Sequence, residues 1–137
     1  DGSGETNLTA DPADDRDPVW SPDGSKLVFI SDRDGENELY TMNVNDMRQV
    51  CRTKAKGWSP AWSPDSKRIS FIGEGWRLGV MSPDGSDRKF MGTPAGCAPD
   101  ECQWSPDGKW IVFSCEYAGH GGRVGTWIYL APVASSP

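Results

Sequence analysis

Two acidic segments hold the residues with the most evident capacity for chemistry, Asp11-Pro-Ala-Asp-Asp-Arg-Asp17 and Asp32-Arg-Asp-Gly-Glu-Asn-Glu38. Carboxylates at this density are potential ligands for a hard cation such as Ca²⁺. The second segment, however, has its glycine at the fourth position and not at the sixth, where an EF-hand loop requires it. An Asp-Gly turn whose aspartate accepts backbone hydrogen bonds explains the same residues without metal. We therefore expect no metal and no other cofactor.

A histidine in a glycine-rich loop is the next candidate for chemistry. His120 is the only histidine of the chain and lies in Ala-Gly-His-Gly-Gly122. The glycines leave its ring unpositioned, and the chain has no Gly-x-Ser-x-Gly motif to supply a nucleophile. A surface loop is thus favoured over a catalytic site, and we predict that the protein is not an enzyme.

The four cysteines suggest structure rather than catalysis. They form no Cys-x-x-Cys pair, so a zinc site is not expected. Cys97 and Cys102 flank a short loop and could pair in an oxidising compartment. Cys51 and Cys115 stand in predicted strands, where we expect them to be packed as small apolar residues.

A repeat of 42 residues organises the chain and must position these candidates. Trp20, Trp62 and Trp104 open the runs W-S-P-D-G-S-K-L-V-F-I, W-S-P-D-S-K-R-I-S-F-I and W-S-P-D-G-K-W-I-V-F-S. Proline presets φ in the Ser-Pro-Asp turn and the aspartate, which is Asp23, Asp65 or Asp107, bonds the turn backbone. Because the tryptophan recurs in every repeat, we expect it to form the core between repeats rather than a carbohydrate platform.

Short strands follow each turn. Both alternating faces of residues 26–31 are apolar, which predicts a strand covered on both sides. We predict third strands at residues 38–44, 77–81 and 126–131, and fourth strands at residues 48–53 and 88–92. Four short strands in a repeat of this length are typical of a β-propeller blade, a four-stranded antiparallel sheet, so the fold class is all-β.

The segments 18–43, 60–72 and 103–114, each containing Trp-Ser-Pro-Asp, resemble the TolB-type β-propeller repeat. WD repeats are excluded because no Gly-His pair leads each unit. The resemblance implies a six-bladed propeller that is often periplasmic or otherwise extracytoplasmic. It also implies a protein-binding scaffold or an accessory domain of a larger enzyme.

The chain accommodates three such blades as a single segment: an outer strand at residues 5–9, repeats at about 10–53, 54–92 and 93–131, and a tail at 132–137. Residues 1–9 align with residues 84–92, which makes 5–9 a fourth strand without its blade, while the third blade lacks a fourth strand. We therefore predict a six-bladed head-to-tail homodimer that exchanges this strand. The alternative is that the chain is a piece of a longer one.

Charge narrows the possible partners. A formal net charge of −6 disfavours nucleic acid, and no apolar run approaches the roughly 18 residues of a membrane span. The loops at residues 10–18, 32–38, 53–59, 74–77, 94–102 and 116–125 should emerge on one face, and they hold twelve acidic and six basic residues. This face, which could also be acidic merely for solubility, is the predicted site for a protein or basic peptide. Its candidate residues are Asp14, Asp15, Asp32, Arg33, Asp34, Glu74, Glu116 and His120.

The sequence thus predicts a non-catalytic binding scaffold. Trp58, Trp76, Trp110 and Trp127 stand outside the repeated tryptophan column and are the freer candidates for a binding surface. The alternative function is a propeller fragment of a larger hydrolase or polysaccharide-degrading enzyme, for which the sequence supplies no nucleophile, base or metal set.

Overall fold

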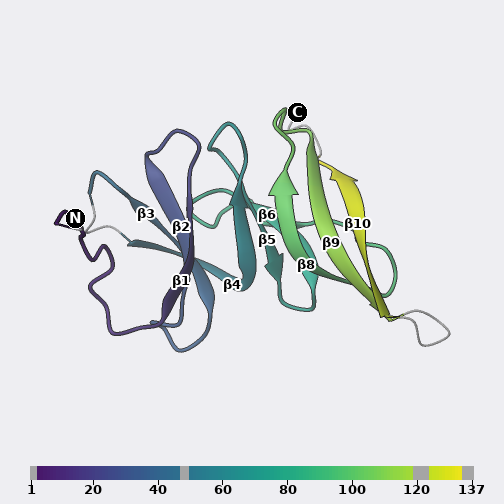
Figure 1. Ribbon diagram of the computed structural model, residues 1–137, viewed down its shortest axis with the longest axis horizontal. Coiled ribbons are helices and arrows are strands. Elements are labelled where there is room, and N and C mark those ends of the chain that lie inside the picture. Colours follow the sequence, from purple (N-terminus) through teal and green to yellow (C-terminus); the bar gives the residue numbers. More distant parts are fainter. Residues whose placement is uncertain (1–2, 47–49, 119–123, 134–137) are drawn as a thin grey trace.

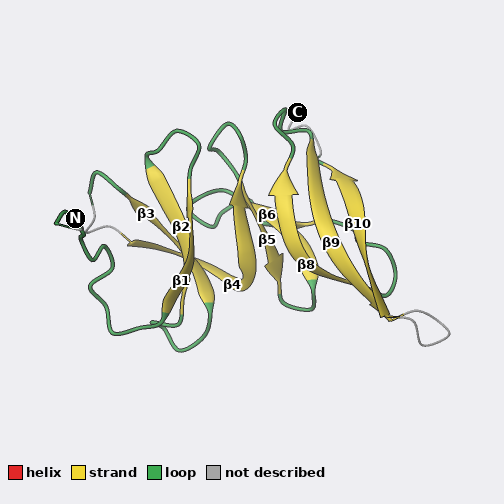
Figure 2. Cartoon of the chain, in the orientation of Figure 1, coloured by secondary structure: helices red, strands yellow, loops and turns green. Residues whose placement is uncertain are grey.

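The computed structural model describes residues 3–46, 50–118 and 124–133, which form strands and no helix (Figure 1; Figure 2). The prediction of an all-β chain is therefore confirmed. Within these residues there is no helix that could cross a membrane. The strands are β1 (Asp15–Trp20), β2 (Lys26–Ser31), β3 (Glu38–Asn43), β4 (Val50–Trp62), β5 (Ile69–Gly73), β6 (Arg77–Met81), β7 (Lys89–Phe90), β8 (Cys97–Trp104), β9 (Trp110–Ala118) and β10 (Val124–Pro132).

The strands form three antiparallel groups, which we call units and which follow one another along the long axis of the molecule (Figure 1). Unit 1 contains β1, β2, β3 and the first half of β4. Unit 2 contains the second half of β4 with β5, β6 and β7, and unit 3 contains β8, β9 and β10. The long strand β4 serves two units because Ala55 pairs with β3 while Trp58 pairs with β5.

Several strand boundaries differ from the sequence prediction. The fourth strand of unit 1 continues without a break into the first strand of unit 2, so the expected repeat boundary after residue 53 falls inside β4. The fourth strand of unit 2 is only Lys89–Phe90. The three strands of unit 3 have no fourth strand beside them in the described part of the chain.

Residues 5–9, predicted as a strand, form no strand in the single chain. The side-chain oxygen of Asn7 instead accepts hydrogen bonds from the backbone N–H groups of Thr9, at 3.1 Å, and Ala10, at 3.0 Å. A strand requires a neighbouring strand for its backbone hydrogen bonds. The strand that the sequence analysis predicted as the neighbour of residues 5–9 is one in the third blade of a second chain.

Units 1 and 2 bury apolar side chains on both of their faces, whereas unit 3 buries them on the face toward unit 2. In β2, residues 27–31 are all buried, as predicted. Val28 faces unit 2 and joins a cluster with Leu39, Ile69 and Phe71, whereas Phe29 faces the opposite way. A second cluster joins units 2 and 3. Two core clusters are therefore layers between consecutive units, and a third, which contains Phe29 and Tyr40, covers the outer face of unit 1.

The Ser-Pro-Asp turns repeat the same hydrogen bonds in all three units. In unit 1, the N–H of Gly24 donates to the carbonyl of Ser21 at 2.8 Å, and the Ser21 hydroxyl donates to Asp23 at 2.7 Å. Asp65 and Asp107 accept the corresponding serine hydroxyl bonds at 2.6 Å each. Gly24 has a φ of 70°, and Ser66 occupies the equivalent place with a φ of 59°, so the turn requires a left-handed residue there.

The repeated tryptophans connect consecutive units. The indole N–H of Trp62 donates to the carbonyl of Val19 at 3.1 Å, and that of Trp104 donates to the carbonyl of Ala61 at 3.2 Å. Each of these indoles thus donates to the backbone of the preceding unit. The acceptor is the residue immediately before the repeated tryptophan of that unit. Trp20 differs because no described unit precedes unit 1, and its side chain is exposed.

Trp62→Ala should lower the free energy of unfolding by about 3–5 kcal/mol because it opens a cavity between units 1 and 2 and removes the indole hydrogen bond. The matched control is Trp76→Ala, at an exposed tryptophan of the β5–β6 turn, which should cost less than about 1 kcal/mol. Urea unfolding followed by circular dichroism measures both values. Equal losses for the two variants would contradict the layered core.

The turn aspartates should make the free energy of unfolding depend on pH. The hydrogen bond from the Ser21 hydroxyl, with those from Ser25, lowers the pKa of Asp23 from 3.8 to about 2. A pKa below its unfolded value stabilises the fold above about pH 4, and this contribution is lost as the pH falls toward 2. Asp23→Ala should therefore unfold at lower urea concentration than the parent at pH 7, with the difference shrinking below pH 4. Asp100→Ala, at an exposed aspartate of β8, is the control and should change the free energy of unfolding at pH 7 by less than about 0.5 kcal/mol.

Candidate functional site

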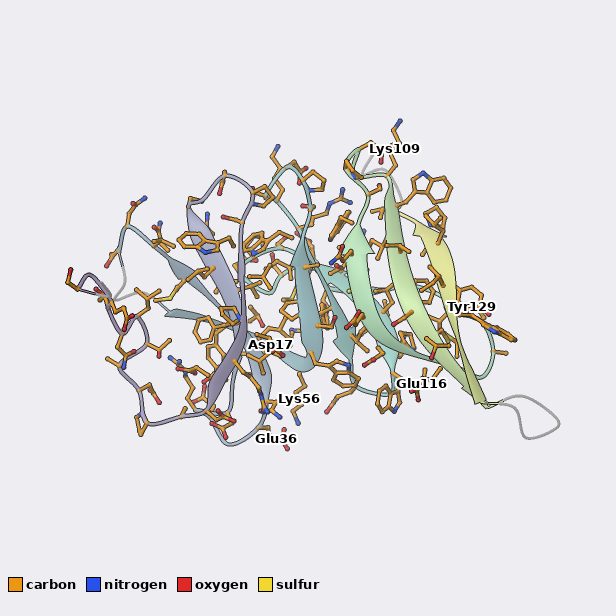
Figure 3. All side chains as sticks on the ribbon, viewed as in Figure 1. Asp17, Glu36, Lys56, Lys109, Glu116 and Tyr129 are labelled. Atoms are coloured by element: carbon orange, nitrogen blue, oxygen red, sulfur yellow. A yellow bond between two sulfur atoms is a disulfide. The ribbon has the colours of Figure 1, made fainter. Side chains whose placement is uncertain are left out.

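The predicted acidic loops lie along one edge of the molecule, which we call the loop face. Glu36, Lys56 and Glu116 lie toward the lower edge in Figure 3, with Asp17 above them, whereas Lys109, from a Ser-Pro-Asp turn, lies on the opposite edge. The arrangement follows from the antiparallel strands, because successive connections alternate between the two ends of a sheet. His120 falls outside the described residues.

Asp15 and Arg33 form the most buried ion pair of this face. The Arg33 guanidinium is 3.0 Å from Asp15 Oδ1, and both side chains are largely buried. The same guanidinium lies over the ring of Tyr40, 4.8 Å from its centroid, and over that of Phe29 at 5.3 Å. Arg33 therefore covers the outer aromatic face of unit 1, which makes this pair structural.

Burial alone would raise the pKa of Asp15, but the pKa lies below its usual value. The hydroxyls of Ser31 and Thr9 and the Arg33 guanidinium stabilise the carboxylate and outweigh the burial. The second oxygen, Oδ2, is buried and makes no hydrogen bond of good geometry within the described residues. We therefore attribute the lowering to the summed field of these donors, of which the Arg33 bond is the one with clear geometry.

Two other predicted acidic residues, Asp32 and Asp34, accept hydrogen bonds from neighbouring segments of unit 1. Asp32 accepts a hydrogen bond from the backbone N–H of Asp14 at 2.9 Å, which joins the loop before β1 to the loop after β2. Asp34 accepts a short bond, 2.6 Å, from the Tyr40 hydroxyl. Among the described residues, no three carboxylate, cysteine or histidine side chains gather as a metal site would require.

A pocket of about 440 Å³ opens on the loop face between units 1 and 2. Lys56 lies in it and pairs with two carboxylates, Glu36 of unit 1 and Glu74 of unit 2, the latter at 3.5 Å. The hydrogen bond to Glu36 is the main cause of a raised pKa at Lys56. The lining residues are Arg16, Asp17, Ile30, Glu36, Asn37, Lys56, Gly57, Trp58 and Glu74.

Trp58 gives this pocket an apolar wall. It contacts Trp76 edge to face, with ring centroids 4.8 Å apart, and Trp76 is itself exposed. The sequence analysis named Glu74 and both tryptophans but missed Lys56, Asp17 and Glu36 as members of one site. Only the meeting of loops from two consecutive units brings them together.

A larger cavity, of about 960 Å³, lies on the opposite face, among the turns. Asp65, Lys67 and Arg68 of one turn line it together with the short strand β7 and the end of β10. Its charged side chains have both signs, and Arg68 is engaged over the ring of Trp104 at 4.7 Å. The excess of acidic residues therefore distinguishes the loop face from this one.

The fold and the repeated tryptophan turns define a protein of the propeller-repeat class. The chain belongs to the TolB beta propeller domain family, whose model matches residues 1–127. No curated protein sequence matches it.

Solved structures share the fold. A putative TolB from Agrobacterium tumefaciens has a TM-score of 0.74 and 22% identity over 91% of this chain and 47% of its own. TolB from Acinetobacter baumannii has a TM-score of 0.66 and 22% identity over 85% of this chain and 30% of its own. An oligogalacturonate lyase from Vibrio parahaemolyticus has a TM-score of 0.68 and 17% identity over 80% of this chain and 32% of its own. The chain thus spans about half or less of these proteins.

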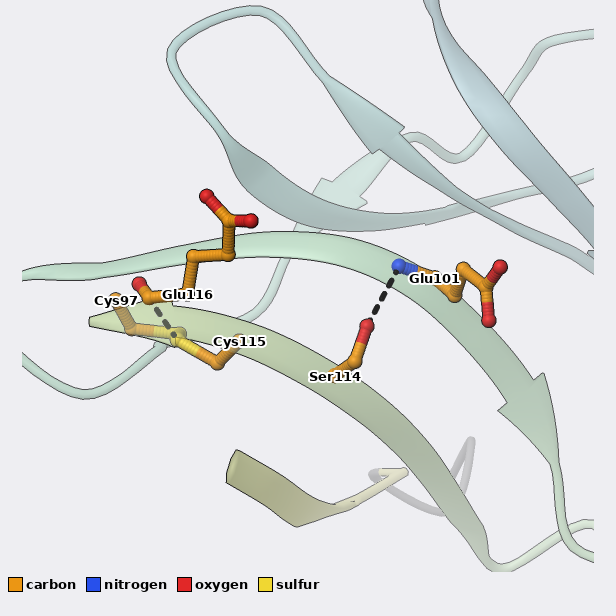
Figure 4. The surroundings of a disulfide bond; sticks show 5 residues. All are labelled: Cys97, Glu101, Ser114, Cys115 and Glu116. Atoms are coloured by element: carbon orange, nitrogen blue, oxygen red, sulfur yellow. Dashed lines mark hydrogen bonds between the residues drawn. A yellow bond between two sulfur atoms is a disulfide. The ribbon is translucent and has the colours of Figure 1, made fainter. Parts of the chain in front are cut away.

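The cysteine pairing differs from the predicted one. Cys97 forms a disulfide with Cys115, whose Cα lies 5.5 Å away, and not with Cys102 (Figure 4). Pro99 lies opposite Cys115 in the β8–β9 ladder, so Cys97 and Cys115 are diagonal neighbours. Cys97 and Cys102, in contrast, lie on one strand, where five residues span about 16 Å. The side chain of Cys51 lies outside the described part of the structure.

Cys102 is a buried free thiol with no features of a nucleophile. Burial raises its pKa to about 11. Its sulfur contacts the carbonyl of Ser59 at 3.3 Å and the hydroxyl of Ser70 at 3.4 Å, both in unit 2. Cys102 is therefore part of the contact between units 2 and 3.

Peptide mapping without reductant should recover a fragment that links Cys97 to Cys115, and a thiol reagent should label Cys102 only after unfolding. Cys115→Ser should lower the free energy of unfolding by about 3 kcal/mol, the value for closing a loop of this length. Comparing the parent with and without reductant gives a second measure of the same loss. Recovery of a Cys97–Cys102 fragment would contradict the observed register.

Proposed function

We propose that this chain is a non-catalytic binding scaffold that recognises a basic protein or peptide through its loop face. The observation that carries the proposal is the pocket between units 1 and 2, where Asp17, Glu36 and Glu74 outnumber the cations Arg16 and Lys56. The loops of this face also account for the whole formal charge of −6. A region of one charge sign attracts partners of the opposite sign and accelerates their association.

A basic side chain of the partner could enter the pocket in place of Lys56. The carboxylates of Glu36 and Glu74 already hold one ammonium group, Lys56 Nζ, between them. An arginine or lysine of a partner would meet the same two carboxylates with the Trp58 ring beside them, and aromatic rings also attract cations. The Lys56 side chain can withdraw toward solvent because it is only half buried.

The proposal includes a six-bladed ring in which the three units are blades, with a second copy of the chain supplying the other three. It also includes a periplasmic or other extracytoplasmic location. Two observations support that location: the similarity to TolB structures and the Cys97–Cys115 disulfide, since disulfides persist in oxidising compartments.

A second candidate function is a propeller segment of a larger hydrolase or polysaccharide-degrading enzyme. The structural similarity to an oligogalacturonate lyase favours it. The adjoining coding sequence discriminates between the two, because this alternative requires catalytic residues outside the present chain.

A fluorescent lysine- and arginine-rich peptide should bind at low salt. Its affinity should fall steeply as ionic strength rises from about 0.01 M to about 0.15 M, where the screening length shortens from about 30 Å to about 8 Å. The double variant Glu36→Gln/Glu74→Gln should weaken binding about fivefold, corresponding to about 1 kcal/mol from two partly exposed charge contacts. Fluorescence anisotropy measures both effects.

The matched control is Asp87→Asn, which removes one carboxylate from the opposite face and should leave the affinity within about twofold. Asparagine tolerates the left-handed backbone of this position, where φ is 52°. Binding that is insensitive to salt, or that the control weakens as much as the double variant, would refute recognition through the loop face.

A further inference from the structure

One apolar position of unit 3 is exposed although its counterparts are fully buried. The register identifies the counterparts: Tyr129 pairs with Phe113 as Tyr40 pairs with Phe29, so Ile128 corresponds to Leu39 of unit 1. The same register makes Leu78 the counterpart in unit 2. Leu39 and Leu78 are 0% exposed, whereas Ile128 is 70% exposed. Ile128 thus occupies a position that belongs to the core in units 1 and 2 but is exposed in unit 3.

The following unit supplies that cover in both complete contacts. Leu39 of unit 1 packs in a cluster with Trp62, Ile69 and Phe71 of unit 2. Leu78 of unit 2 packs in a cluster with Ile111 and Phe113 of unit 3. Ile128 and the neighbouring Leu130, also exposed, therefore present the surface on which a further unit would pack.

The other end of the chain presents the complementary half of this contact. Trp20 is 55% exposed, whereas its counterpart Trp62 is 6% exposed. Its indole N–H has no acceptor among the described residues, although Trp62 and Trp104 each donate to a preceding unit. The two acceptors, Val19 and Ala61, each immediately precede a repeated tryptophan. The corresponding acceptor in unit 3, for the tryptophan of a following unit, is the carbonyl of Gln103.

A third position repeats the pattern. Arg68 of unit 2 lies over the ring of Trp104, the tryptophan of the next unit. Its counterpart in unit 3, 42 residues later, is Trp110, an exposed side chain at the start of β9. Trp110 is thus placed to lie over the tryptophan of a following unit, as Arg68 lies over Trp104.

We infer that unit 3 of one copy binds unit 1 of a second copy head to tail, with Ile128, Leu130 and Trp110 of one copy packing around Trp20 of the other. In this contact the Trp20 indole N–H donates to the Gln103 carbonyl. A second copy is the occupant because each chain carries both halves of the contact, and a half-turn about a two-fold axis closes two such contacts into one ring. The inference rests on the proposed propeller ring and assigns its interface.

The N-terminal arm also fits this arrangement. Residues 5–9 align with residues 88–92, so Leu8 corresponds to Met91. Met91 packs against the layer between units 2 and 3, and Leu8 packs against Phe29 and Tyr40 on the outer face of unit 1. Leu8 therefore already occupies the place of a residue from a preceding fourth strand. Among the described residues, β10 is the outermost strand of its sheet, so this strand can pair beside the β10 of the partner.

Light scattering after size exclusion, with the full chain, tests the interface. The parent should have twice the 15.0 kDa chain mass. Ile128→Asp and Trp20→Asp should each be monomeric while keeping the far-ultraviolet circular dichroism of the parent, because both side chains are exposed in the single chain. The control Trp76→Asp replaces an equally exposed tryptophan in the β5–β6 turn with the same charge and should leave the dimer intact.

Mixing the two monomeric variants makes the test specific for head-to-tail contact. The Ile128→Asp chain keeps an intact Trp20 end and the Trp20→Asp chain keeps an intact Ile128 end, so an equimolar mixture should regain a dimer through one good contact. A symmetric contact of like ends would not recover in this way.

A parent that remains monomeric at all concentrations, as expected if further units of a longer polypeptide normally cover these ends, would overturn the inference. A dimer that survives both substitutions, or a mixture that does not recover, would also overturn it. Peptide binding measured on the same samples separates this outcome from a failure of the loop-face proposal, because the pocket lies within one copy, between units 1 and 2.

Discussion

The structure depends on one constraint: each sheet has two apolar faces, and both must be covered. Val28 and Phe29 are adjacent in β2 and point in opposite directions, yet both are buried. Burying such side chains contributes about 1.5–3 kcal/mol each. Unit 2 covers Val28, whereas Phe29 is covered by Tyr40, by the Arg33 guanidinium and by the N-terminal residue Leu8. The outer face of unit 3 lacks such a cover in the single chain, because Ile128 and Leu130 are exposed there.

Features that recur in every unit and depend on nearby residues could be predicted from the sequence. The Ser-Pro-Asp turns, β2, β6 and the burial of Trp62 belong to this class, because a period of 42 residues fixes their positions and local hydrogen bonds fix their shapes. The division of loops and turns between two edges follows from strand alternation alone. The fold class and most strand positions were therefore within reach of sequence reasoning.

Features that depend on the exact register between strands, or on which neighbour is present, were not predictable. The Cys97–Cys115 pairing depends on a β-bulge between Pro99 and Cys102, which shifts the β8–β9 register. The pocket around Lys56 depends on how closely the loops of two units approach. The prediction for the tryptophan column assumed a preceding unit for every tryptophan, so the exposure of Trp20 could not be read from the repeat.

The two proposed interactions respond to salt in opposite ways. Apolar contacts around Trp20 and Ile128 would join two loop faces on the same side of the ring, and each face bears the formal charge of −6. Their mutual repulsion opposes the ring at low ionic strength and weakens as salt screens it. The same field attracts a basic partner most strongly at low salt, and that partner neutralises the repulsion. Binding at the loop face and closure of the ring therefore favour each other, as thermodynamic linkage requires of two coupled equilibria.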